Sequence, residues 1–438
     1  MSSAGRGRAT RRTPRLLPTE TQVDDSVASD AIPTPGTSAS AVTGTNSGSL
    51  YGGALGRTTI QSGTVPTLSH TSSQSRPSSP KRRNRSPTKA VRTLADLGLA
   101  QIPVNSVGLD SRHQIPPSLL GLFDSLKRVG RGIGTIPKDL EAEVSAILRP
   151  RDPEIEPNWL VPTDAYPVKQ QFPLRFEFES LRRVAEMSSE CMISSAPEVV
   201  WNERVHSRLL EIALTPHREA LLHRNVTTVD VYPEFLLPTV GKAEVAASSV
   251  LEDLAALSTV ENAAAPPPAM LQTKRVDYVI ALDDVQVRSE AEQHVRVLVG
   301  SGSVVESINH VDHAFLRSRP ISVSIETKTP DGGEQHGRVQ LGIWGASHIM
   351  RLRAAMGDRA EQREPLALPL VLVVGNKWLV FFLVDHGDHM DLIEVALLDD
   401  APSILGCYKV VALIRELGRW STEVYRPWFR SSVLGISE

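Results

Sequence analysis

Two oppositely charged side chains, Glu326 and Lys328, stand two residues apart in the short run ISVSIETK at 321–328. Because side chains alternate between the faces of a strand, this run predicts one apolar face and one polar face, with Ser322, Ser324, Glu326 and Lys328 on the polar one. A carboxylate and an amine are costly to bury alone, so a strand between apolar runs carries them for a reason. Metal-dependent cleavage of a phosphodiester bond would be such a reason.

A second carboxylate, Asp277, lies in the otherwise apolar run KRVDYVIAL at 274–282. If this strand neighbours the Glu326 strand, both carboxylates point into one pocket that suits Mg²⁺, a hard cation that takes oxygen ligands, with Mn²⁺ as an alternative. The ion would lower the pKa of a bound water and polarise a phosphoryl oxygen. Lys328 would orient the attacking water or stabilise charge in the transition state. Gln340, near the start of the following helix, would hold that water or a phosphate.

A plain surface ion pair is the competing interpretation of Glu326 and Lys328, because a neighbouring carboxylate and amine on a strand usually pair in that way. In that case the protein would have a structural role and no chemistry at this position.

Two groups of histidines receive structural interpretations. His310 and His313 flank Asp312, and no further metal ligands follow at a supporting distance, which favours structural hydrogen bonding. His386 and His389 lie among acidic residues after a predicted hairpin. We expect a solvated loop there, with incidental metal binding as the alternative.

The predicted elements that must position these residues form a mixed α/β sandwich. On the first helix, Glu198, Asn202 and His206 are spaced by four and form a polar stripe, which is typically solvent-facing. The elements are a helix from Pro197 to about Leu214, strands at 275–282 and 321–328, a helix from Arg338 to about Met356, a buried hairpin at 368–384 and a last amphipathic helix at about 404–424.

The charge of the chain is uneven along its length. Residues 1–95 hold 13 basic and 4 acidic residues, which leaves 34 basic and 46 acidic residues for the rest. We expect a disordered basic Ser/Pro-rich tail at 1–93, a helical lead-in at 94–165 and a main domain at 166–432 with an insertion at about 240–272. The acidic main part does not resemble a surface that coats DNA without specificity.

A basic cluster within the tail resembles a nuclear localisation signal, with a generic solvated linker as the alternative. The Ser-Pro pairs at Ser79 and Ser86 flank it, so phosphorylation would add negative charge beside the cluster and weaken binding to an import receptor. We therefore expect a nuclear protein, with the cytoplasm as the alternative location. The cluster comprises Lys81, Arg82, Arg83 and Arg85.

Cysteine content and hydropathy favour a protein of a reducing compartment that does not enter a membrane. Cys191 and Cys407 are too few for a disulfide framework and are expected as free thiols. The N-terminus lacks the apolar core of a secretory signal. The apolar run at 366–384 is interrupted by Gly375-Asn376-Lys377, so it predicts a β-hairpin and not a membrane span.

Several runs taken together resemble those of fungal proteins with a PD-(D/E)xK nuclease-like domain, over about residues 94–430. The runs that carry the resemblance are Trp201-Asn202, Val205-His206, Leu209-Leu210, Val276-Asp277-Tyr278, Ser307 to His310, Pro320 to Lys328, Gln340 to Trp344 and Pro427 to Phe429.

The resemblance implies a restriction-endonuclease-like core, in which helices flank a central mixed β-sheet. It also implies Mg²⁺ held by Asp277 and Glu326, Lys328 as the catalytic lysine, Gln340 as a supporting residue, and Glu198 as the acidic residue of the first core helix. One departure is the residue before Asp277, which is Val and not the Pro of the family's name. Another is the 49-residue separation of Asp277 and Glu326, which requires an inserted element such as a helix at 290–299.

Two function classes follow from these observations. The first is a Mg²⁺-dependent nuclease that acts on DNA, or on RNA, in the nucleus. The second is a catalytically inactive nuclease-fold binding or scaffold protein that works through its basic tail. The acidic main part favours the second class, whereas the joint presence of Asp277, Glu326, Lys328 and Gln340 favours the first.

Overall fold

A computed structural model of the chain describes residues 93–150, 152–168, 171–239, 275–303, 305–357, 366–400 and 402–436. The predicted tail up to residue 92, with its basic cluster, and the predicted insertion at 240–272 lie outside the described residues.

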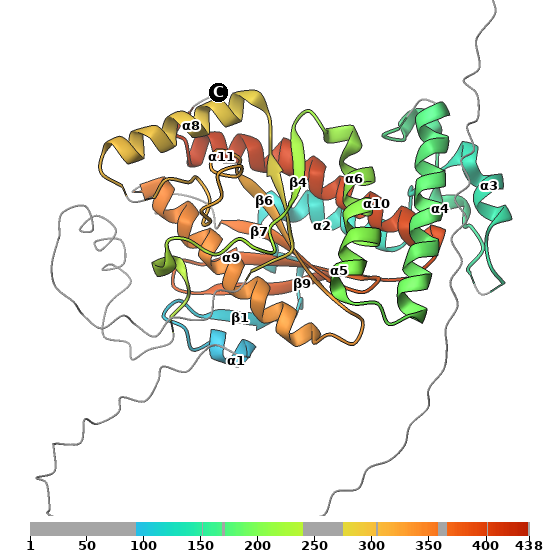
Figure 1. Cartoon of the computed structure of the whole chain (residues 1–438), viewed down its shortest axis with the longest axis horizontal. Helices are drawn as coiled ribbons and strands as arrows, with labels where there is room; N and C mark the ends of the chain where they lie inside the picture. The colour runs from blue at the N-terminus through green and yellow to red at the C-terminus, as the bar shows by residue number, and fades with distance from the viewer. Residues whose placement is uncertain are drawn as a thin grey trace, which may run out of the picture. The chain divides into compact units, whose positions relative to one another are not determined.

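A seven-stranded sheet lies at the centre of the described chain (Figure 1). Its strands are β1 (Val104–Val107), β4 (Leu221–Asn225), β5 (Tyr278–Leu282), β6 (Ile321–Lys328), β7 (Ala367–Val374), β8 (Lys377–Asp385) and β9 (Met390–Asp399). They are ordered β1-β9-β8-β7-β6-β5-β4, and β2 (Ile136–Pro137) and β3 (Leu160–Val161) form a separate pair. Since β6 runs antiparallel to β5 and parallel to β7, the sheet is mixed, and the predicted mixed α/β fold is confirmed.

Helices pack on both sides of this sheet. They are α1 (Leu94–Leu97), α2 (Pro117–Gly130), α3 (Glu141–Ala146), α4 (Gln171–Ile193), α5 (Glu198–Trp201), α6 (Ser207–Leu214), α8 (Val285–Gly300), α9 (Glu334–Met356), α10 (Ile404–Trp420) and α11 (Arg426–Ser432). Two π-helical turns, η5 (Asn202–His206) and η9 (Ser421–Tyr425), join α5 to α6 and α10 to α11. Short 3₁₀ turns lie at Arg112–Gln114, Lys138–Leu140, Pro157–Trp159, Thr163–Ala165, Thr215–His217 and Glu234–Leu236.

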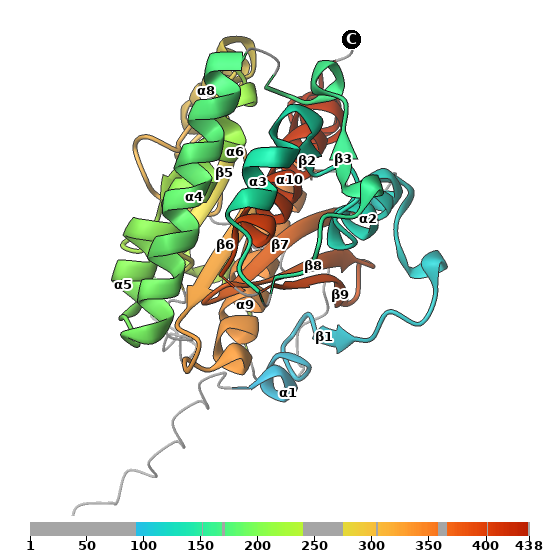
Figure 2. The same ribbon diagram turned by 90° about the vertical axis from the view of Figure 1, so that its right-hand side faces the viewer.

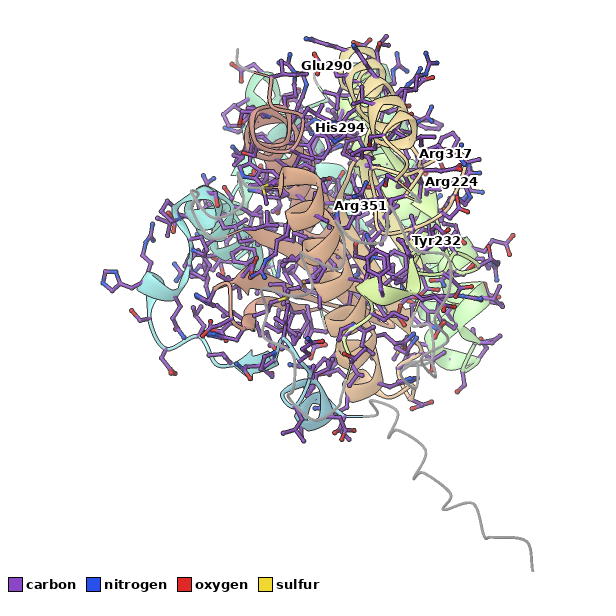
Figure 3. All side chains as sticks on the ribbon, turned by 90° about the vertical axis from the view of Figure 1, so that its left-hand side faces the viewer. Arg224, Tyr232, Glu290, His294, Arg317 and Arg351 are labelled. Carbon is purple, nitrogen blue, oxygen red and sulfur yellow. The ribbon has the colours of Figure 1, made fainter. Side chains whose placement is uncertain are left out.

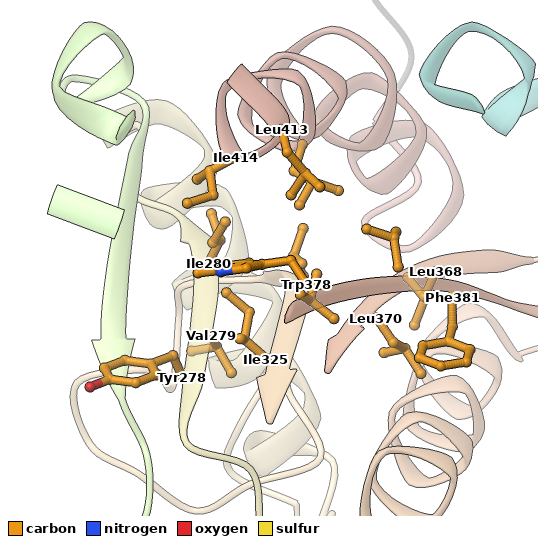
Figure 4. Packing of buried hydrophobic residues seen from close by; sticks show 14 of the residues in the cluster. Tyr278, Val279, Ile280, Ile325, Leu368, Leu370, Trp378, Phe381, Leu413 and Ile414 are labelled. Atoms are coloured by element: carbon orange, nitrogen blue, oxygen red, sulfur yellow. The ribbon is translucent and has the colours of Figure 1, made fainter. Parts of the chain in front are cut away.

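Helices α9 and α10 cover opposite faces of the sheet (Figure 2). On the α10 side, Ile280 and Trp378 pack beneath Ile414 (Figure 4). On the other side, Leu370 and Phe381 face α9. Both faces of the central strands are therefore withdrawn from water, as is usual for strands that lie between helical layers.

Strand β6 departs from the predicted alternation. All residues from Ile321 to Thr327 are buried, and a bulge interrupts the pairing of β5 with β6. The Ser324 hydroxyl accepts a hydrogen bond from the Trp344 indole of α9 at 3.0 Å, whereas the Ser322 hydroxyl accepts one from Ser421 of η9 at 2.8 Å. The prediction that these serines share one polar face with Glu326 is therefore wrong at Ser322, because the bulge shifts the alternation.

The apolar run at 366–384 forms the predicted hairpin of β7 and β8. Gly375 at its turn has a φ of +60°, a conformation that favours glycine. None of the helices in the described ranges has both the length and the hydrophobicity to cross a bilayer. Strand β1 was not predicted: it lies within the supposed helical lead-in and pairs in parallel with β9.

Glycines allow α9 to approach the sheet closely. A Cβ at Gly345 would lie 2.7 Å from Leu383 Cδ2 and 2.9 Å from Leu370 Cδ1. We expect Gly345→Ala to lower the free energy of unfolding by about 1–3 kcal/mol, measured by urea denaturation, because the core must shift to admit the methyl group. Gly121→Ala in α2 is the matched control: nothing lies within 4 Å of a Cβ there. An equal effect of both substitutions would contradict this account.

Candidate active site

The five residues identified from the sequence border one open cleft of about 350 Å³. The cleft lies where β6 ends and β5 begins, because the antiparallel pairing of these strands places the residue before β5 beside the last residues of β6. The lining residues are Glu198, Thr227, Arg275, Val276, Asp277, Glu326, Lys328 and Gln340. Although Asp277 and Glu326 are far apart in the sequence, strands β5 and β6 are paired, which brings the two residues to the same cleft. The chain between them contains α8, which includes the helix expected at 290–299.

Asp277 is held rigidly at the edge of the cleft. Its backbone N–H donates to the Ile325 carbonyl oxygen at 3.0 Å, which extends the β5–β6 ladder by one residue. Its carboxylate Oδ2 lies 2.8 Å from both the backbone N–H and the hydroxyl of Thr327, and Oδ1 accepts a hydrogen bond from Asn202 at 3.4 Å. Since the side chain is buried and its oxygens are fixed by donors, its position does not depend on a bound ligand.

Glu326 is a buried acid beside another acid. Its residue surface is 1% exposed. Burial first, and then the negative charge of Asp277, raise the pKa of Glu326 to about 8 even though the Lys328 amine opposes both effects. Without a cation between the two acids, the Glu326 carboxyl therefore tends to keep its proton near neutral pH.

Lys328 lies against Glu326, as the competing interpretation expected, with Nζ 2.5 Å from Oε1, but the pair is not on the surface. The two side chains are 13% and 2% exposed, so the interpretation as a plain surface ion pair is wrong. The amine also lies 3.3 Å from Glu198 Oε2 and donates to the Thr327 carbonyl oxygen at 2.7 Å. Burial alone would lower the pKa of Lys328, yet the surrounding acids, Glu326 first, outweigh burial and raise it. The amine therefore remains charged.

Glu198 lies at the start of α5, as predicted, and is partly exposed. Burial raises its pKa, Lys328 opposes that effect, and Asp277 adds to it. Its closest charged partner is Lys328, which makes it a residue that positions the lysine.

Gln340 lies in the second turn of α9, because the helix begins at Glu334 and not at Arg338 as predicted. Its amide nitrogen donates to the Arg275 carbonyl oxygen at 3.1 Å. Its amide oxygen is buried and has no hydrogen-bond partner within the described part of the chain. A buried amide oxygen normally accepts at least one hydrogen bond, so this oxygen lacks a donor.

The polar stripe at Asn202 and His206 does not face solvent, so that prediction is wrong. The π-helical turn η5 directs both side chains toward the sheet. Asn202 Oδ1 lies 2.8 Å from the Thr327 hydroxyl and 3.0 Å from His206 Nδ1, and the His206 Nε2–H donates to the Gly375 carbonyl oxygen at 2.8 Å. Burial lowers the pKa of His206 to about 4. A chain of contacts thus runs from the β7–β8 turn to Asp277.

Sequence reasoning missed the supporting role of these residues, although Asn202 and His206 were among those that carried the resemblance. Spacing by four on a helix shows that the two side chains share a face but not what that face contacts. Thr327 was missed because alternation places the middle residue of Glu-x-Lys on the other side of the strand.

His310 lies in the core and not in a polar site. Its ring stacks on His348 at 4.6 Å between centroids and meets the Trp344 ring edge-on at 4.5 Å. Neither ring nitrogen of His310 has a hydrogen-bond partner in the described ranges, so the predicted structural hydrogen bonding is wrong for this residue. Arg351, labelled in Figure 3, lies on the same helix as Trp344 and His348 and donates to the Ser307 carbonyl oxygen at 2.6 Å. The Trp344 side chain is itself fully buried in the core.

The donors of the cleft fit a hard divalent cation. Asp277 and Glu326 offer carboxylate oxygens, which Mg²⁺ and Mn²⁺ prefer over nitrogen or sulfur. The raised pKa of Glu326 reflects its burial first and then the charge of Asp277, and Lys328 offsets these effects only in part. The volume of the cleft also leaves room for the water molecules that Mg²⁺ retains.

Comparison with known proteins gives an independent line of evidence. The family model described as the PD-(D/E)XK nuclease superfamily matches residues 149–426, which is more than half of the chain. No curated protein and no solved structure matches the chain. The matched segment contains the mixed sheet from β4 to β9 and all five candidate residues that border the cleft. The chain therefore belongs to the PD-(D/E)XK nuclease superfamily.

Proposed function

We propose that the protein is a Mg²⁺-dependent nuclease that hydrolyses phosphodiester bonds in DNA, with RNA as the alternative substrate. The observation that carries the proposal is the buried Glu326–Lys328 pair, which borders the same cleft as Asp277. Burying two acids and an amine close together costs free energy of folding. A catalytic role explains this cost better than a contribution to stability does.

Each residue has a role that follows from its contacts. Asp277 and Glu326 hold the Mg²⁺, or Mn²⁺ in its place. When bound, the ion supplies a more acidic water and offsets charge on the phosphate. The Lys328 amine, held by Glu198, orients the attacking water or stabilises the charge that develops on the phosphate in the transition state. The buried amide oxygen of Gln340, which has no hydrogen-bond partner among the described residues, would accept a hydrogen bond from that water.

The test is a cleavage assay with the full chain on double-stranded DNA, single-stranded DNA and RNA, in Mg²⁺, in Mn²⁺ and in EDTA. We expect cleavage that requires the divalent ion. The competing function, an inactive nuclease-fold scaffold, draws support from the excess of acidic residues after position 95. Nucleic-acid binding without cleavage under any metal condition would favour the scaffold.

Thr327 offers a milder perturbation of the same site. Thr327→Val removes the hydroxyl that lies 2.8 Å from both Asp277 Oδ2 and Asn202 Oδ1 but keeps the shape of the side chain. Since partners that orient a metal ligand typically contribute 10–100-fold, we expect Mg²⁺-dependent cleavage to fall by about tenfold with a higher Mg²⁺ requirement. Thr215→Val, at an exposed position, is the control. Unchanged Mg²⁺ dependence would contradict a supporting role for Thr327.

For location we propose the nucleus, on the basis of the basic cluster in the tail. Replacement of its four basic residues by alanine should move a fluorescent fusion to the cytoplasm, and Ser79→Asp with Ser86→Asp should do so in part. A fusion that stays nuclear after the fourfold replacement would contradict import through this cluster. The cluster is Lys81, Arg82, Arg83 and Arg85.

A further inference from the structure

We infer that the turn between β8 and β9 carries a binding site for a transition-metal ion such as Zn²⁺, formed by His386, His389 and Asp391. Among the residues that the structure describes, these form the group of three potential metal ligands whose donor atoms all lie within 4.8 Å of one another. The inference does not rest on the proposed nuclease function.

The two imidazoles converge on one carboxylate. His386 Nε2 lies 3.2 Å from Asp391 Oδ2, and His389 Nε2 lies 3.8 Å from Asp391 Oδ1. The rings stack with centroids 4.7 Å apart, and both Nε2 atoms lie near the Asp391 carboxylate. Ligand atoms around a tetrahedral Zn²⁺ with bonds of about 2.0–2.1 Å are separated by roughly 3.3–3.5 Å. The observed separations therefore require little movement to bind an ion.

The Asp388 carboxylate orients the His389 ring for metal binding. Asp388 Oδ1 lies 2.7 Å from His389 Nδ1, which fixes the proton of the neutral ring on Nδ1 and leaves the lone pair of Nε2 free. A carboxylate behind a histidine ligand is the usual arrangement at zinc sites, where it orients the ring and strengthens the ligand.

The turn itself is held in shape without a metal. The His386 N–H donates to the His389 carbonyl oxygen at 3.0 Å, and Gly387 adopts a φ of +97°. Arg353 at the end of α9 forms an ion pair with Asp385 and donates to the Gly387 carbonyl oxygen at 2.9 Å. Because Asp385 neutralises this arginine, its charge is not free to repel a cation at the neighbouring ligands.

The site is distinct from the nuclease cleft in position and in chemistry. Lys328 pairs with Val374 and Val374 pairs with Lys377, so the cleft lies at the end of the sheet where β8 begins. The histidines follow Asp385 at the other end of β8, on the order of 25 Å away at strand spacing. Two imidazoles favour Zn²⁺, Cu²⁺ or Ni²⁺, whereas the cleft offers carboxylate oxygens to Mg²⁺. Three protein ligands leave one tetrahedral position for water.

The experiment uses the full chain with Asp277→Asn and Glu326→Gln, so that the cleft binds no ion. Co²⁺ is the spectroscopic probe and Zn²⁺ the competitor. We expect one equivalent of Co²⁺ to give the intense visible absorption of a tetrahedral site, and Zn²⁺ to displace it. His386→Ala or His389→Ala should abolish the signal.

The graded variant is Asp388→Asn, which leaves all three ligands in place. It should weaken Zn²⁺ binding by about 10–100-fold, since it removes only the carboxylate behind His389. His113→Ala, at an exposed histidine, should leave binding unchanged. Absence of Co²⁺ or Zn²⁺ uptake, or uptake that survives both histidine substitutions, would overturn the inference. Uptake that Asp388→Asn leaves unchanged would also overturn it, because it would mean adventitious binding by surface imidazoles.

Discussion

Lys328→Met should lower the rate of Mg²⁺-dependent cleavage by at least about 10²–10³-fold, the effect expected when one positioned donor is lost from a charged transition state. Methionine keeps most of the volume of the lysine side chain, so the packing against Gly337 of α9 is retained. The effect should fall on kcat at saturating Mg²⁺ and substrate. The amine contacts acids and a carbonyl oxygen of the protein, and in the proposed mechanism it would act on the reacting phosphate only during turnover.

Lys127→Met, an exposed lysine on α2, is the matched control and should leave cleavage unchanged. Both variants should show the far-UV circular dichroism of the unchanged protein. Cleavage by Lys328→Met at the rate of the control would mean that the activity belongs to another site or to a contaminant.

The sequence predicted the central elements because their patterns are local. The run at 321–328 alternates, and the apolar runs on either side of Gly375 are divided by a turn signal, so both gave strands at the observed positions. Strand β1 gave no such signal. Its four residues, Val104–Val107, include Asn105 and Ser106, and it is a strand only because β9 offers an edge to pair with.

The residues of the candidate site likewise fall into those that the sequence predicted and those that it did not. Residue types and a family resemblance identified Asp277, Glu326 and Lys328, which carry charge in unusual surroundings. The residues that hold them, Asn202 and Thr327, were not recognised, because their role depends on a π-helical turn and on which helix covers which face of the sheet. Neither feature leaves a periodic trace in the sequence. Glu326 is buried because helices cover both faces of the sheet at β6. The alternating pattern of the strand itself did not predict this burial.

Glu326→Gln should have opposite effects on cleavage and on the stability of the metal-free protein. Loss of a charged metal ligand should lower Mg²⁺-dependent cleavage by about 10³-fold or more, since the ion contributes several kcal/mol of charge stabilisation. The same change removes a buried acid whose folded-state pKa is raised to about 8. Glutamine has nearly the same shape and cannot ionise, so the metal-free variant should be the more stable protein at alkaline pH.

The pH dependence of unfolding in EDTA tests this directly. Between about pH 4.5 and pH 8 the folded protein retains the Glu326 proton that the unfolded chain releases. The free energy of unfolding therefore falls as the pH rises through this window, and above the window the full loss of stability is present. The advantage of Glu326→Gln should therefore be absent below about pH 4.5 and reach a few kcal/mol by pH 9. Glu292→Gln, an exposed glutamate on α8, should show no such trend.

Mg²⁺ should then reverse the order of stability. At pH 8.5 the ion should raise the melting temperature of the unchanged protein and leave that of Glu326→Gln nearly constant, because a ligand stabilises only the folded state that binds it. If the two proteins instead keep parallel pH profiles in EDTA and respond equally to Mg²⁺, Glu326 is an ionised partner of Lys328 and nothing more. The reversal matters because a scaffold gains nothing from a buried acid that destabilises it, whereas a nuclease would gain a metal ligand that, at neutral pH, loses its proton when the ion binds.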